Sequence, residues 1–235
     1  DAWWHATYGK DVLIWSPPHL QLHLGAGITA IGLLFAIAGQ AGRGAFRRRW
    51  VWQGAMLLVY VDLVHRALFV LAHYTMIPET RTPDFYPFLA ALLLPMVLVS
   101  AGRALGPGAP VLAGLAFLAV SVANDLLLLA IDFDRYTVTP IVVGPALALA
   151  AFARLLGSVR ERGWAAAASG ALVVVVFTAM EAAWMAAVVG RPWPVGRVLS
   201  GLPWSLLAGV LSGYVGWVVG GFLQAIATGT APFRA

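Results

Sequence analysis

The chain has 235 residues, of which 61% are hydrophobic and 11% are charged, and its formal net charge is +5. A soluble domain carries roughly a quarter charged residues, so this composition excludes an ordinary soluble protein and predicts one membrane domain. Cysteine is absent, which removes disulfides and thiolate metal sites. The basic residues are nearly all arginines in short loops, so we interpret them as topology signals and expect no nucleic-acid partner.

The N-terminal stretch DAWWHATYGKDVLIWSPPH is aromatic and polar, unlike the apolar part of a signal peptide. We expect residues 1–19 to be a short interfacial segment; a leader was removed before Asp1, or upstream residues are missing. If residues 1–8 form a surface helix, Asp1 and His5 lie one turn apart on one face. His19 and His23 repeat this spacing at the mouth of the first span.

Seven later segments each contain about 20 mainly apolar residues, the length that a membrane-spanning helix needs. They cover roughly 20–42, 50–73, 86–104, 109–131, 138–156, 164–189 and 201–227. No linker divides them, so residues 20–235 are predicted to form a single transmembrane helical domain. The expected fold is an all-α integral membrane protein, a bundle of about seven transmembrane helices in contact with the lipid bilayer. Its Gly/Ala stretches, such as GAGITAIG, indicate close helix packing.

Arginine asymmetry predicts the orientation of this bundle. If seven spans alternate, nine basic residues, including those of the 42–50 loop, fall on one side and five fall on the other. Cytoplasmic loops carry the excess of arginine and lysine. We therefore expect the C-terminus in the cytoplasm of the cell and the N-terminus on the outer, periplasmic or extracellular side.

All five histidines lie near the outer end of the first two spans, which is the strongest chemical signal in the chain. In the second span, Asp62, His65 and His73 share one helical face, and Arg66 lies one turn after Asp62. A charge near the membrane midplane costs at least about 2.5 kcal/mol. We therefore expect this face to turn into the bundle, with Asp62 engaged by Arg66 or by a polar group of another span. A structural ion pair and a functional role remain alternatives here.

Three further intramembrane polar residues are candidates by default: Asn124, Asp125 and Glu181. They could extend a metal site, relay protons or bind a neighbouring helix. If the surface helix folds back over the first span, Asp1, His5 and His19 converge. One carboxylate and two imidazoles suit copper, zinc or iron, and the absence of thiolates leaves the choice of metal open.

The same stretch distantly resembles the C-type membrane subunit of the copper membrane monooxygenases, the particulate methane and ammonia monooxygenases. The matching positions are Asp1, Trp4-His5, Lys10-Asp11, Trp15 and Ser16-Pro17-Pro18-His19. This resemblance implies Asp1, His5 and His19 as copper ligands and implies partner membrane subunits. The chain differs from the family in a histidine spacing one residue longer and in Leu22, where the family has an acidic residue.

The leading hypothesis is therefore a copper-binding subunit of a monooxygenase-like complex that oxidises a small apolar substrate with O2. His23, Asp62, His65 and His73 would form a second site or support the first. The alternatives are a non-catalytic metal-handling, assembly or structural membrane subunit, and a proton-coupled transporter that uses the intramembrane acids. A retinal protein is excluded because residues 201–227 contain no lysine.

Overall fold

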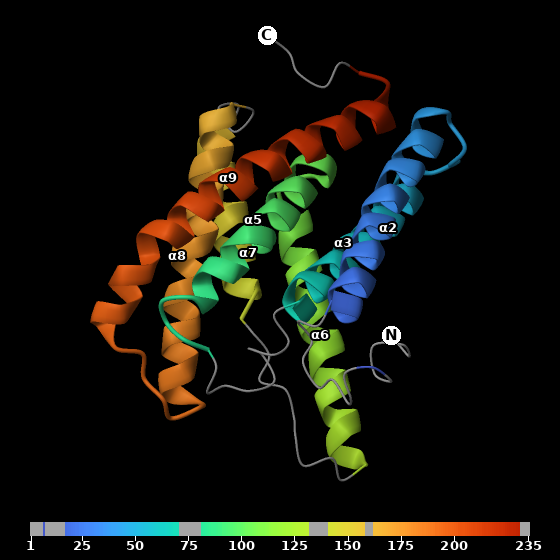
Figure 1. Ribbon diagram of the computed structural model, residues 1–235. Helices are drawn as coiled ribbons and strands as arrows, with labels where there is room; N and C mark the ends of the chain where they lie inside the picture. The colour runs from blue at the N-terminus through green and yellow to red at the C-terminus, as the bar shows by residue number, and fades with distance from the viewer. Residues whose placement is uncertain (1–6, 8–16, 71–80, 132–140, 158–161, 231–235) are drawn as a thin grey trace.

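The computed structural model describes residue 7 and residues 17–70, 81–131, 141–157 and 162–230, the side chains of 18, 19, 69 and 70 excepted. All regular structure within these residues is helical (Figure 1). The helices are α2 (Pro17–Gly42), α3 (Arg49–Val70), α5 (Tyr86–Leu105), α6 (Ala109–Ala130), α7 (Val143–Leu156), α8 (Gly163–Ala187) and α9 (Val195–Thr228). The all-α prediction is confirmed, and the expected interfacial segment at residues 1–19 lies almost wholly outside the described residues.

Five of these helices are long and apolar enough to cross a membrane: residues Leu20–Gly42 of α2, and α5, α6, α8 and α9. The chain is thus a helical protein of membrane character. Helix α7 has 14 residues, which at 1.5 Å per residue is about 21 Å, shorter than a hydrocarbon core of about 30 Å. Helix α3 is long enough but carries Arg49, Asp62 and Arg66 and falls outside the five. Seven membrane crossings remain a prediction.

Helix α9 organises the bundle, because it runs diagonally across α5 on one side and α8 on the other (Figure 1). Its glycines allow both contacts. A Cβ added to Gly216 would lie 2.3 Å from the Met96 carbonyl oxygen of α5, and one added to Gly213 would lie 2.7 Å from the Gly170 Cα of α8. Small residues four apart let helix backbones approach closely in membranes, and α9 does this on two faces.

The GAGITAIG stretch of α2 behaves differently from α9. A Cβ added to Gly25, Gly27 or Gly32 would meet no described atom within 4 Å. Close packing along this stretch is therefore made by its Ala30, which is buried together with Leu34 and Ala38 further along α2, and not by its glycines. Helix α2 packs antiparallel to α3 and reaches α9 at its C-terminal end, where Gly42 lies against Ile226.

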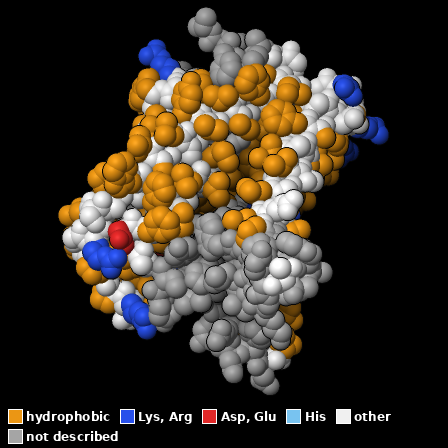
Figure 2. All heavy atoms as spheres, viewed as in Figure 1, with side chains coloured by type: hydrophobic (Ala, Val, Ile, Leu, Met, Phe, Trp, Pro, Cys, Tyr) orange, Lys and Arg blue, Asp and Glu red, His pale blue; other side chains and the backbone are white. Residues whose placement is uncertain are grey.

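The outer surface of the bundle is apolar over its middle, as a membrane-embedded face must be. Hydrophobic side chains cover most of the described face in Figure 2, whereas arginine side chains lie toward its ends. On α9 the exposed large apolar side chains include Leu207, Leu211, Tyr214, Val215 and Phe222. Water-facing helices rarely expose such a continuous apolar surface, so this distribution supports contact with lipid.

Candidate functional site

The predicted metal ligands fall at the start of the chain, where the structure describes little. Asp1 and His5 lie outside the described residues, and His19 is described only as part of the first turn of α2. His23 lies one turn later and is half-buried. Whether Asp1, His5 and His19 converge stays a prediction. His73 also lies outside the described residues.

Asp62 and Arg66 form an ion pair within α3. This is one of the two expected alternatives, the other being a polar group of another span. The Arg66 Nε donates to Asp62 Oδ2 at 2.6 Å, and the two side chains are 34% and 42% exposed respectively. Residues four apart on a helix are neighbours, so this pair forms without help from another element. The prediction that Arg66 engages Asp62 is confirmed.

The expectation that the face with Asp62 and His65 turns into the bundle is wrong for His65, whereas Asp62 is half-buried. His65 is exposed, and its ring lies 6.2 Å from that of Phe117 on α6. The face of α3 that packs inward is the opposite one, with Met56, Tyr60 and Val64 almost fully buried. Asp62 is already paired with Arg66 within α3, so its charge does not need a partner inside the bundle.

Helix α6 carries the next two candidate residues, Asn124 and Asp125, and neither is buried in the bundle. Asn124 is exposed and Asp125 is half-buried, in a half of α6 whose large apolar side chains are also exposed. That half extends beyond the other described helices in Figure 1. Neither side chain is brought to Glu181, which lies on α8, because α6 packs on α3, α5 and α7.

Glu181 belongs to a fully buried ion pair. The Arg81 Nη1 donates to Glu181 Oε1 at 2.5 Å, and both side chains are 0% exposed. The Arg81 guanidinium lies over the Tyr86 ring at 5.5 Å, and Tyr86 packs against Phe177 and Trp193. Aromatic rings thus cover an ion pair that joins the segment before α5 to α8.

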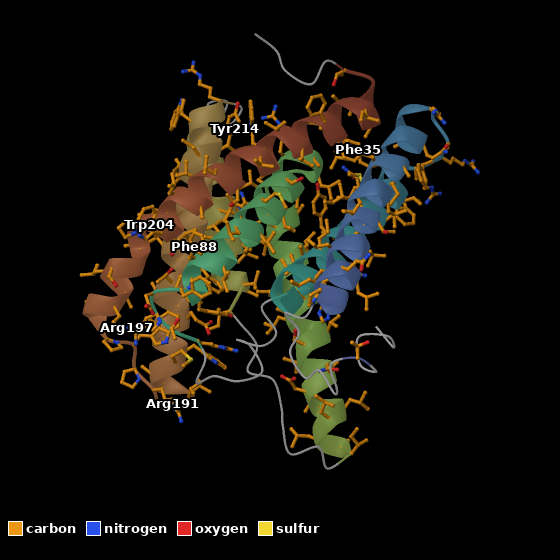
Figure 3. All side chains as sticks on the ribbon, viewed as in Figure 1. Phe35, Phe88, Arg191, Arg197, Trp204 and Tyr214 are labelled. Carbon is orange, nitrogen blue, oxygen red and sulfur yellow. The ribbon has the colours of Figure 1, made fainter. Side chains whose placement is uncertain are left out.

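A second ion pair lies at the surface of the same end. Arg197 Nη2 contacts both carboxylate oxygens of Asp84, at 2.9 and 3.1 Å. Figure 3 shows Arg191 and Arg197 at the end where α8 passes to α9. The short segment 81–85 is therefore fixed by Arg81 on one side, through α8, and by Asp84 on the other, through α9.

Sequence reasoning identified Glu181 but missed its partner. It treated Arg81 as one of the loop arginines, because Arg81 precedes the apolar run that begins at residue 86. The available signal was the isolated carboxylate in an apolar span, since a buried charge requires a partner. Only the fold shows which of several loop arginines supplies it.

The carboxylate and imidazole groups of Asp1, His5 and His19 are chemically suitable ligands for copper. His19 lies in the first turn of α2, at the end of that helix. Among the described side chains, no three of His, Asp or Glu lie close enough to hold one ion. Four of the proposed ligands or neighbours, Asp1, His5, His19 and His73, have no described side chain. Comparison of the chain with known protein families, curated proteins and solved structures found no match.

Proposed function

We propose that this protein is a copper-binding membrane subunit of a monooxygenase-like complex that oxidises a small apolar substrate with O2. The observation that carries the proposal is the Asp1-x3-His5 pair followed by His19 in the first turn of α2. Copper held by one carboxylate and two imidazoles would supply redox chemistry toward O2. The proposal also includes partner membrane subunits, because the resembling family works as hetero-oligomers.

The residues around this motif have physical tasks of their own. Pro17 and Pro18 start α2, since proline suits a first helical turn, and thereby fix where the His19 backbone lies. His23, one turn deeper, could orient a ligand or stabilise the bound carboxylate. The exposed Leu22, Leu24 and Ile28 make this end of α2 apolar, which suits a substrate that arrives through the bilayer.

The proposed topology is seven spans with the N-terminus outside and the C-terminus in the cytoplasm. It is supported by the arginine asymmetry and by the alternation of the seven helices along the chain. In this arrangement α3 and α7 also cross the membrane, α3 with its ion pair intact and α7 together with residues that precede Val143.

Metal analysis of the purified full-length chain tests the proposal. We expect about one copper per chain, lost in both His5→Ala and His19→Ala, because an Asp with a single His rarely suffices. Gln21→Ala is the matched control, since Gln21 is exposed on α2 between the two histidines of that helix. Copper retained in both histidine variants would contradict the proposal. Bound zinc in place of copper would favour the metal-handling alternative.

The proton-coupled transporter is the weaker alternative. It requires Asp62, Asp125 and Glu181 to line one path. Helix α3 packs on α2, α5 and α6, whereas α8 packs on α5, α7 and α9. Glu181 is enclosed with Arg81 and aromatic rings, an arrangement that favours a structural role for this carboxylate.

A further inference from the structure

A cavity of about 240 Å³ lies at the arginine-rich end of the bundle, opposite the Arg81–Glu181 pair. It is enclosed by the start of α3, the turn from α5 to α6, the end of α7 and the flanks of α8 and α9. Its polar lining comes from Arg49, Arg103, Ser169, Trp217 and Gln224, and none of the described residues that line it is acidic. The described lining of the cavity is therefore cationic.

Arg103 is held in this cavity by the shape of α9. Its guanidinium carbon lies 4.2 Å from the centre of the Trp217 ring, a cation–π distance. A Cβ added to Gly221 would lie 2.7 Å from Arg103 Nε, so this glycine leaves the room that the side chain occupies. A guanidinium fixed in this way keeps its geometry without a bound anion, which favours selective binding.

An apolar groove adjoins the cavity and shares Leu105, Gly106 and Pro107 with it. The groove holds about 380 Å³ and runs between α3 and the start of α6. It is lined by Trp50, Gly54, Leu57 and Leu112 among others. A cationic chamber that continues into an apolar groove matches a molecule with a phosphate at one end and a hydrocarbon chain at the other.

We propose that this composite site binds an anionic phospholipid, with the phosphate between Arg49 and Arg103 and an acyl chain in the groove beside Gly54. The helix ends at this level carry the arginines that favour the headgroup region, so the site lies where a lipid phosphate would lie. Basic pockets between transmembrane helices are suited to anionic headgroups. A free phosphate has the same charged group as the lipid headgroup, but it has no hydrocarbon chain that could fill the groove.

Native mass spectrometry of the delipidated full chain tests the site. Dioleoylphosphatidylglycerol should bind more tightly than dioleoylphosphatidylcholine, and Arg49→Gln should reduce this preference by about tenfold, because a charged hydrogen-bond partner is lost. Arg47→Gln is the matched control, an exposed arginine of the same loop that does not line the cavity. Arg49 is itself exposed, so its replacement should not prevent folding. Equal effects of the two variants, or no lipid preference, would overturn the proposal.

A side chain that fills the groove distinguishes binding of a phospholipid from binding of a free anion. A Cβ at Gly54 meets no atom within 4 Å, so Gly54→Leu should fold and occupy the groove. We expect it to weaken phosphatidylglycerol binding several-fold, whereas Gly32→Leu, at an open position of α2 away from the groove, should not. Protein that is stabilised by inorganic phosphate, with phosphatidylglycerol binding unaffected by Gly54→Leu, would refute a lipid and indicate a soluble anion.

Discussion

The Arg81 guanidinium and the Glu181 carboxylate meet at 2.5 Å in an environment where neither side chain is exposed. They are 100 residues apart in the chain, so their bond fixes the segment before α5 against α8. A buried pair is expensive to break because the surviving charge loses its counter-charge, although a well-packed apolar pair can replace both members.

The first prediction follows from the different chemistry of the two partners. Glu181→Met should lower the free energy of unfolding by about 3–5 kcal/mol, since arginine cannot lose its proton and Arg81 would be left charged and buried. Arg81→Met should cost less, because the carboxyl group of Glu181 can take up a proton. The measurement is thermal or denaturant unfolding of purified protein in detergent.

The double variant Arg81→Met/Glu181→Met is the control for this prediction. It should recover most of the stability lost in Glu181→Met, because no unpaired charge remains. A double variant as unstable as Glu181→Met would show that the loss comes from packing and would contradict the ion-pair explanation.

The second prediction concerns the backbone contact between α9 and α8. Gly213→Ala should destabilise the protein by about 1–3 kcal/mol, because the added methyl group would push against the Gly170 backbone. Gly27→Ala on α2 is the matched control; its Cβ meets open space, and alanine favours a helix over glycine. Similar stabilities of the two variants would show that α9 does not approach α8 as closely as described.

The third prediction is a pH dependence at Asp84. Desolvation raises the pKa of Asp84, but hydrogen bonds from Arg197 and the backbone and the positive charge of Arg197 outweigh it, so the pKa is lower than usual. A carboxyl group whose pKa is lower in the folded state contributes stability above its unfolded pKa and loses it as the pH falls through the folded value. Both side chains are exposed, so the contribution should stay below about 1 kcal/mol.

Asp84→Asn tests this dependence. The wild-type chain should be slightly more stable than the variant at pH 7, and the difference should vanish as the pH falls below about 4, where the carboxylate takes up a proton. Unfolding curves of both proteins across this range are the measurement. A constant difference would mean that the variant acts through packing on Gly201, whose Cα lies against the Asp84 backbone.

The fourth prediction tests orientation with single cysteines, which the chain permits because it has none of its own. Ala45→Cys, in the exposed loop between α2 and α3, should react only with reagents that reach the cytoplasm. Val195→Cys, exposed at the start of α9, should react from outside the cell. Labelling of both from the same side would refute the proposed alternation of seven spans.

The sequence alone determined the helical membrane class and nearly all helix positions, because apolar runs of about 20 residues and Gly, Pro or Arg separators are local properties of the chain. It also offered the Asp62–Arg66 pair as one of two alternatives, because these residues are neighbours on any helix. The tertiary structure decided which face of α3 packs inward, since that depends on the apolar surface offered by Tyr60 and Val64 and by the neighbouring helices. It alone decided that Arg81 pairs with Glu181 and that Arg103 and Arg49 share a cavity, because such contacts join residues distant in sequence through the path of α9 and α5.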